Sequence, residues 1–242
     1  MIKNKDQFIN IRLSEFPALY HVRKTIYNFI QNQSQKFSGD VLDLGCGEKP
    51  YKETILGFPL VKKYVGLDIK TAIVYKEDVK PDYYWDGQTI PFSDNTFDTI
   101  LATEVLEHCP YPSKTISEIF RVLKKDGNFV FTVPFLFPTH EIPHDEFRYT
   151  PFSITRLLKE AGFKNIDVVA RGGWRASLSQ TIGLFIYNSR AASLSERLVR
   201  KLIKPIILIM MWYLYKTDVV PQDLINEKEN TLFTGLAGIA KK

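Results

Sequence analysis

The chain has 242 residues, of which 45% are hydrophobic and 13% aromatic, so it can bury the core of one α/β domain with an appendage. Charged residues make up 24% and are spread along the chain, which excludes a low-complexity or repeat protein. The net charge of +5 admits an anionic partner, but an excess of this size is ordinary for a globular domain and identifies none.

The first sixteen residues carry alternating charges and no long apolar run, so they lack the hydrophobic centre of a secretory signal. This predicts a cytoplasmic protein. The two cysteines, Cys46 and Cys109, lack the paired spacing of zinc or redox sites, and we expect reduced, structural thiols.

Helical spacing of apolar residues predicts an amphipathic helix over residues 18–37. Short β-type runs then alternate with helical stretches, a pattern typical of βαβ crossovers. The predicted fold is therefore α/β, a Rossmann-like, doubly wound and mostly parallel sheet with a leading helix and a helical insertion before the last strand. The predicted strands are residues 41–44, 64–68, 97–102, 128–133 and 165–170, with a closing strand in 231–242.

Two helices between these strands have terminal signals. Ser113 is expected to cap a helix that runs to Leu123 and ends at the 124–127 cluster, and Thr150 precedes Pro151 at the start of a helix ending at Gly162. We expect a single domain over residues 1–242. It divides into an N-terminal helical cap (1–38), a core (39–173), a helical insertion or lid (174–230) that covers the sheet edge or the active site, and a closing strand (231–242).

A glycine turn follows the first predicted strand. Asp43 ends that strand, and Gly45 and Gly47 lack the Cβ atoms that would keep a ligand away from the backbone. A nicotinamide-binding fingerprint needs a third glycine where this chain has Pro50, which counts against an oxidoreductase. Asp68 ends the next strand, where a carboxylate can accept hydrogen bonds from both ribose hydroxyls of an adenosyl group.

Four stretches together carry a family resemblance: D-L-G-C-G at 43–47, G-L-D at 66–68, D-G-Q-T-I-P-F-S-D-N-T-F-D at 86–98 and E-V-L-E-H at 104–108. The sequence resembles the class I S-adenosylmethionine-dependent methyltransferases, in particular their small-molecule, methyltransferase type 11-like branch. The resemblance covers roughly residues 41–163 and implies S-adenosylmethionine as the cofactor.

The resemblance also assigns cofactor contacts. Asp43, Gly45 and Gly47 would lie under the methionine part and Asp68 would hold the ribose. Asp86, with Gly87 beside it, would contact the adenine amino group, and Glu104 is included in the site. The alternative for Asp43, Asp68 and Asp86 is a purely structural role, such as capping a turn. Many members carry a third glycine where this chain has Lys49, so we expect a different loop course beyond Gly47.

The stretch from 135 to 151 is dense in titratable and aromatic residues, as functional loops often are. It resembles the P-H-D-x-x-R-Y-T stretch of methyltransferases associated with bacterial surface glycans. We predict His144 as the general base, His140 as the second choice, and Asp145 as an orienting group or alternative base. The alternative is that His144 and Asp145 only fix the loop.

Two further roles near this loop are not expected. For His108 we expect capping or packing rather than catalysis. No metal is expected either, because Pro143 makes a helical His140–His144 pair improbable and no third ligand is evident.

Residues 190–216 combine basic side chains with the apolar run 205–215, which is shorter than a bilayer-spanning helix. A lid or packing helix, peripheral contact with a membrane, and a dimer contact all remain open, and the oligomeric state is not determined.

The predicted activity is methyl transfer to oxygen of a small-molecule acceptor, on a sugar or surface-glycan precursor. The alternatives are a lipid-linked or quinone-like acceptor at the inner membrane face, or a non-catalytic protein that binds S-adenosylmethionine. A nucleic-acid acceptor is not expected, because residues 102–105 replace the Asn/Asp-Pro-Pro-aromatic motif of base-amine methyltransferases.

Overall fold

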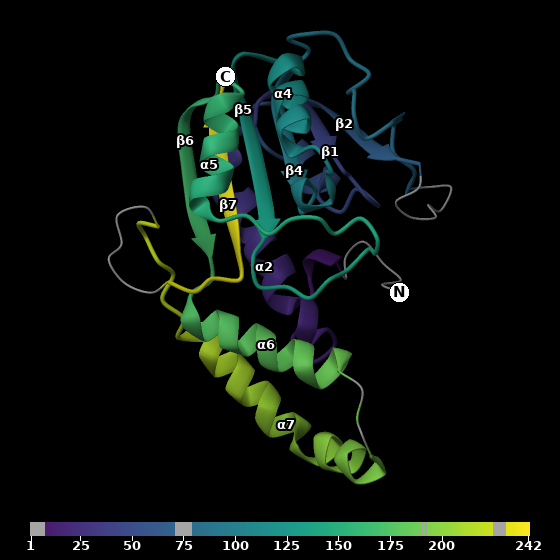
Figure 1. Ribbon diagram of the computed structural model, residues 1–242, viewed down its shortest axis with the longest axis vertical. Helices are drawn as coiled ribbons and strands as arrows, with labels where there is room; N and C mark the ends of the chain where they lie inside the picture. The colour runs from purple at the N-terminus through teal and green to yellow at the C-terminus, as the bar shows by residue number, and fades with distance from the viewer. Residues whose placement is uncertain (1–7, 71–78, 190, 192, 225–230) are drawn as a thin grey trace.

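Seven strands form one sheet in the computed structural model, which describes residues 8–70, 79–189, 191, 193–224 and 231–242. The strand order is β3-β2-β1-β4-β5-β7-β6. The strands are β1 Gly39–Leu44, β2 Val61–Ile69, β3 Tyr83–Trp85, β4 Phe97–Thr103, β5 Leu123–Pro134, β6 Lys164–Arg171 and β7 Gly235–Lys241. The helices are α2 Pro17–Asn32, α3 Lys52–Leu56, α4 Pro112–Val122, α5 Pro151–Glu160, α6 Trp174–Asn188 and α7 Leu194–Lys216, with 3₁₀ turns η1 Ser34–Lys36 and η3 Leu106–His108 (Figure 1).

The sheet is parallel from β3 to β5, and β7 lies antiparallel between β5 and β6. The chain winds from β1 to one side through β2 and β3, then crosses to the other side through β4 and β5. This reversal makes the carboxyl ends of β1 and β4 the switch point at which open α/β sheets bind ligands. The predicted doubly wound, mostly parallel fold is confirmed.

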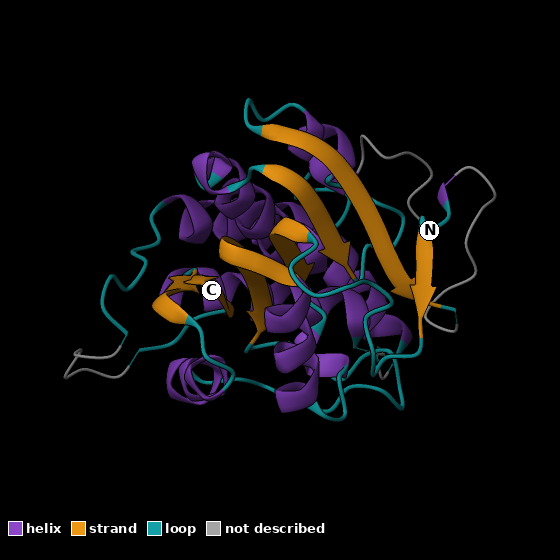
Figure 2. Cartoon of the chain, turned by 90° about the horizontal axis from the view of Figure 1, so that it is seen from above, coloured by secondary structure: helices purple, strands orange, loops and turns teal. Residues whose placement is uncertain are grey.

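Both faces of the sheet are buried, because apolar residues occupy successive positions along its central strands. On β4, Ile100 packs with α4 and α5, whereas Leu101 points to the other face and packs with α2 and α3. Viewed from above, helices lie on either side of the strands (Figure 2).

The predicted helix ends are partly wrong. The helix expected from Ser113 begins at Pro112, with Tyr111 at the N-cap and no side-chain cap. Its end is also displaced, because β5 starts at Leu123 and takes the 124–127 cluster into the strand. The Thr150 cap is confirmed, since its hydroxyl accepts the Ser153 amide at 3.2 Å. The leading helix ends at Asn32 rather than at residue 37, and the three-residue β3 was not predicted.

The insertion between β6 and β7 forms a helical hairpin at the carboxyl end of the parallel strands (Figure 1). Helix α6 packs against α2, and Gln180 on α6 donates a hydrogen bond to the Leu136 carbonyl at the start of the loop after β5. Helix α7 packs mainly on α6 and extends away from the sheet. The predictions that fall on residues 1–7, Arg190 and 225–230 lie outside the described residues. None of the described helices is long and apolar enough to cross a membrane.

Candidate active site

The glycine turn after β1 closes against the segment after β4. Gly45 has φ +69°, and a Cβ atom placed there would lie 2.3 Å from a methyl carbon of Val105. Gly47 has φ +51°, and a Cβ atom at that position would meet no other atom within 4 Å. Only glycine suits both the left-handed backbone and the close approach at position 45. The turn therefore brings the two sides of the switch point into contact and leaves open space beside Gly47.

Asp43 lies beneath this turn and is 1% exposed. The Tyr64 hydroxyl donates a hydrogen bond to its Oδ2, while its Oδ1 has no hydrogen-bond partner. The pKa of Asp43 is raised to about 7, chiefly by burial and also by the nearby Asp68 carboxylate, against the lowering effect of the Tyr64 hydrogen bond. An unpartnered buried carboxylate oxygen is costly, so a ligand donor at this position would relieve the cost.

Asp68, at the end of β2, anchors the turn. Its Oδ2 accepts the Gly47 amide at 2.8 Å and its Oδ1 accepts the Ile69 amide at 2.7 Å. Each carboxylate oxygen can accept a second hydrogen bond, so Asp68 retains capacity for the two ribose hydroxyls of an adenosyl group. S-adenosylmethionine fits three features of this turn: the open space at Gly47, the Asp43 oxygen that has no hydrogen-bond partner, and the Asp68 carboxylate.

Asp86 follows β3 and is exposed. Its Oδ1 accepts the amides of Gln88 and Thr89, each at 2.8 Å, and these bonds lower its pKa. Gly87 has the positive φ of +80° that this turn needs. The turn-capping alternative accounts for these contacts, and the adenine contact of Asp86 and Gly87 stays a prediction.

Lys49 adopts φ +53°, the backbone region that a glycine at this position would favour. The side chain is 9% exposed, and its ammonium lies 3.2 Å from Asp82 Oδ1. Lys49 thus holds a left-handed backbone without being glycine, and the different loop course expected beyond Gly47 stays a prediction.

Two loops join at the acceptor side of the switch point. The carbonyl of Glu107, after β4, accepts the amides of Glu146 and Phe147 from the loop after β5, at 2.9 and 3.1 Å. The Tyr149 hydroxyl donates to the Leu106 carbonyl at 2.8 Å. These bonds fix the loop against the E-V-L-E-H stretch.

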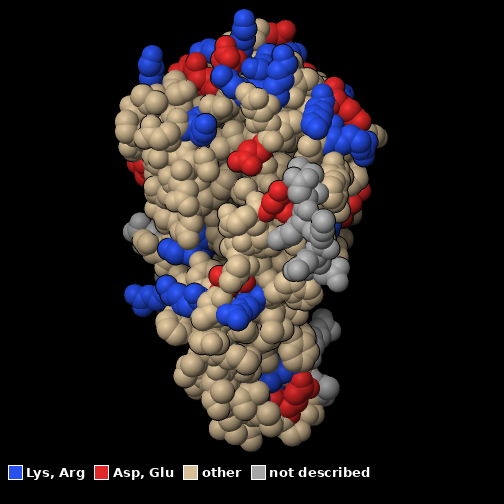
Figure 3. Space-filling view, turned by 90° about the vertical axis from the view of Figure 1, so that its left-hand side faces the viewer, with Lys and Arg blue, Asp and Glu red and all other residues tan. Residues whose placement is uncertain are grey.

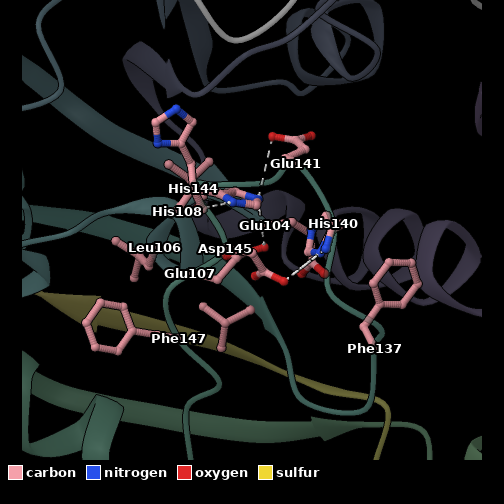
Figure 4. Close-up of polar contacts among 12 residues, drawn as sticks. Glu104, Leu106, Glu107, His108, Phe137, His140, Glu141, His144, Asp145 and Phe147 are labelled. Atoms are coloured by element: carbon pink, nitrogen blue, oxygen red, sulfur yellow. Dashed lines mark hydrogen bonds and ion pairs between the residues drawn. The ribbon is translucent and has the colours of Figure 1, made fainter.

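His108 and His140 meet where these loops join (Figure 4). Their rings are 4.9 Å apart in an edge-to-face arrangement. Nδ1 of His108 is 2.9 Å from the His144 carbonyl, and Nδ1 of His140 is 3.3 Å from Asp145 Oδ2. With Glu107, these two histidines form a group of potential metal ligands among the described residues. The sequence analysis expected capping or packing for His108 and did not predict its contact with His140. The signal was the parallel pairing of β4 and β5, because the segments that follow neighbouring parallel strands start side by side.

The His144 ring does not join this group. Its side chain is exposed and points away from His140 and Glu107 (Figure 4). Asp145 is 3% exposed at its side chain and forms a two-oxygen ion pair with Arg148, at 2.6 and 2.8 Å. The Arg148 bonds hold the pKa of Asp145 well below its usual range, so this carboxylate suits orientation of His140 rather than proton uptake.

Glu104 is held by a residue that the sequence did not single out. Arg171, at the end of β6, donates to Glu104 Oε1 at 2.7 Å and is only 4% exposed. Glu104 itself has φ +54°. One carboxylate oxygen is thus committed to Arg171, and the predicted cofactor contact of Glu104 would use the other.

Comparisons with known proteins agree with this fold. The Archaeoglobus fulgidus structure of an S-adenosylmethionine-dependent methyltransferase is 17% identical, with a TM-score of 0.53, over 98% of this chain and 97% of that chain. At this identity the likeness defines the fold.

Residues 42–131 match the family model of the methyltransferase domain. This stretch of the chain is therefore similar to a methyltransferase domain, in agreement with the resemblance to the class I S-adenosylmethionine-dependent methyltransferases.

Two curated relatives illustrate the range of acceptors. A ubiquinone biosynthesis O-methyltransferase from Nitrosococcus oceani is 26% identical over 127 residues, 49% of this chain and 53% of the relative. A sterol 24-C-methyltransferase from Gibberella zeae is 32% identical over 141 residues, 54% of this chain and 36% of the relative. The chain thus spans about half or less of the length of these relatives.

Proposed function

We propose that this protein transfers the methyl group of S-adenosylmethionine to oxygen of a small-molecule acceptor, on a sugar or surface-glycan precursor. One observation supports this proposal most. The glycine turn at Gly45, which would accommodate an adenosyl group, contacts the segment that leads into the group formed by His108 and His140. A cofactor bound at this turn would therefore lie at the same switch point as the titratable side chains.

The cofactor would supply a methyl group on a sulfonium, and the protein would hold the acceptor oxygen in line and keep water away. His140 is the proposed activating group for the acceptor hydroxyl. Its Nδ1 faces Asp145 and the Pro138 carbonyl, so its Nε2 is the nitrogen available to accept a proton. Phe137 packs edge-on against the same ring.

Replacing His140 tests this role. His140→Ala is expected to lower the rate of methyl transfer by 10²–10⁴-fold, the usual contribution of a general base. His144→Ala, the matched control on the same loop, is expected to retain transfer within a few-fold. The measurement is S-adenosylhomocysteine production with a panel of sugar nucleotides and lipid-linked acceptors.

Equal losses in both variants would overturn the assignment of His140. If the unchanged protein binds the cofactor but produces no S-adenosylhomocysteine with any acceptor class, the non-catalytic alternative takes the lead.

A second candidate is a lipid-linked or quinone-like acceptor met at a membrane surface, and the exposed face of α7 supports it. Apolar side chains protrude along the whole helix, including Leu202 at 68%, Ile206 at 69% and Ile209 at 68% exposure. In the space-filling view, the lower part of the molecule, formed by α6 and α7 in Figure 1, carries mostly uncharged surface with a few charged groups (Figure 3). The basic residues on α7 are Arg197, Arg200, Lys201, Lys204 and Lys216.

Apolar side chains flanked by basic ones are the composition of helices that lie in a membrane interface, and Trp212 and Tyr213, both more than half exposed, are residue types enriched there. Binding to an anionic lipid surface would place α7 in the headgroup region. The hairpin would then hold the membrane surface close to the candidate active site, because Gln180 of α6 donates a hydrogen bond to the loop that carries His140.

Vesicle flotation tests this candidate. Vesicles of equal parts phosphatidylglycerol and phosphatidylcholine are expected to retain the protein at low salt. The triple variant Leu202→Ser, Ile206→Ser, Ile209→Ser should bind at least tenfold more weakly, because three apolar side chains no longer enter the interface. The control is Leu60→Ser with Tyr111→Ser, two exposed sites elsewhere. Failure of the unchanged protein to float would remove this candidate.

A further inference from the structure

Glu107 is the least satisfied charged side chain near the site. Its side chain is 0% exposed, and neither carboxylate oxygen has a hydrogen-bond partner. A buried carboxyl group without partners is strongly destabilising unless a cation or donor binds it.

The atoms facing Glu107 are histidine nitrogens. Nε2 of His108 lies 3.8 Å from Glu107 Oε1 and 3.8 Å from Glu141 Oε2. One ligand atom from each of Glu107, His108 and His140 lies within 4.8 Å of the others. The three side chains come from the segments after β4 and β5, which the Glu107 carbonyl holds together.

The partners of the opposite ring nitrogens orient both histidines. Nδ1 of His108 faces the His144 carbonyl at 2.9 Å, which can only accept, so in the neutral ring this nitrogen carries the proton and Nε2 carries the lone pair. Nδ1 of His140 faces two acceptors, the Pro138 carbonyl at 3.2 Å and Asp145 Oδ2 at 3.3 Å, which gives the neutral ring the same tautomer. A carbonyl or carboxylate behind the ring is the arrangement that orients metal-binding histidines.

We propose that Glu107, His108 and His140 bind a divalent transition-metal ion, with Glu141 at the open side of the site. Two imidazoles and one carboxylate suit Zn²⁺, Co²⁺ or Fe²⁺ better than Mg²⁺, which prefers oxygen ligands. Bonds of about 2.1 Å place ligand atoms about 3.4 Å apart in a tetrahedral site, so the ligand atoms, now within 4.8 Å of one another, must approach by up to about 1.4 Å on binding.

This proposal departs from the expectation of no metal site, which considered His140 with His144 and found no third ligand. The ligand set instead runs through His108 and Glu107. A bound ion would take the Nε2 lone pair of His140, so in the metal-bound protein His140 would be a ligand and not the general base proposed above. The ion would supply Lewis-acid chemistry, lowering the pKa of the acceptor hydroxyl so that its proton could pass to water. That role rests on the proposed function, whereas the binding itself does not.

Co²⁺ binding to the full chain tests the site, because Co²⁺ reports its coordination through visible absorption. One equivalent of Co²⁺ is expected to bind, to produce the intense bands of a tetrahedral site, and to be displaced by Zn²⁺ but not by the same concentration of Mg²⁺. His108→Ala, His140→Ala and the near-isosteric Glu107→Gln should each weaken Co²⁺ binding at least 100-fold. His144→Ala is the matched control and should bind as the unchanged protein does.

Calorimetric binding of S-adenosylhomocysteine to each variant verifies that the fold is intact, and this readout separates loss of the metal from loss of the methyltransferase site. Absence of a tetrahedral Co²⁺ spectrum in the unchanged protein would overturn the proposal. Binding by a folded His108→Ala or Glu107→Gln variant at the strength of His144→Ala would overturn it equally. Metal binding without any methyl transfer would leave the site in place and count only against the proposed function.

Discussion

Arg171→Met is expected to lower the free energy of unfolding by about 3–5 kcal/mol, the range for breaking a buried ion pair by removing one partner. The guanidinium, 4% exposed, reaches from β6 across β7. It donates to the carbonyls of Leu236 at 3.1 Å and Val133 at 3.0 Å, and to Glu104 at 2.7 Å. Methionine fills similar volume but leaves these acceptors unsatisfied.

Urea unfolding followed by circular dichroism measures this loss. The control is Arg156→Met, which removes an exposed arginine paired with Glu160 at 3.4 Å and should change stability by less than about 1 kcal/mol. Adding Glu104→Gln to Arg171→Met should recover part of the loss, because the uncompensated carboxylate is then removed. A loss below about 1 kcal/mol for Arg171→Met would contradict the structural role assigned to it.

Asp68→Ala is expected to weaken S-adenosylmethionine and S-adenosylhomocysteine binding tenfold or more, about 1.4 kcal/mol. The substitution removes the proposed acceptor for the ribose hydroxyls. It also frees the Gly47 amide, so the glycine turn loses its anchor to β2.

Isothermal titration calorimetry provides the test, with NAD as the negative ligand for every protein. Asp126→Asn is the control, because Asp126 is an exposed carboxylate far along the sheet, paired with Lys241 at 3.0 Å. Unchanged affinity in a folded Asp68→Ala protein would mean that the ribose is held elsewhere. Absence of binding by the unchanged protein would remove the cofactor site itself.

The amino-acid sequence by itself determined six of the seven strands, the order of those strands and the glycine turn after β1, whereas the three-residue β3 was not predicted. Strands such as residues 97–102 are buried on both faces of the parallel sheet. Because both faces are buried, successive residues are apolar, and this run can be recognised in the sequence. The glycines at 45 and 47 are also local signals, because the positive φ angles there are a property of the turn. Helix ends were less secure: Ser113 has the right chemistry for a cap, but Pro112 already fixes a helical φ, so the helix starts before it.

Tertiary structure decided which side chains meet. In the sequence, His140 and His144 are two histidines of one loop and nothing distinguishes them. In the structure, hydrogen bonds join that loop to Glu107, the His140 ring faces His108, and the His144 side chain is exposed. Arg171 lies 67 residues from Glu104 and becomes its partner only because β7 brings β6 beside the end of β5. Such contacts depend on the path of the whole chain, since direction and burial of a polar side chain are set by its neighbours in space and carry no periodic signal in the sequence.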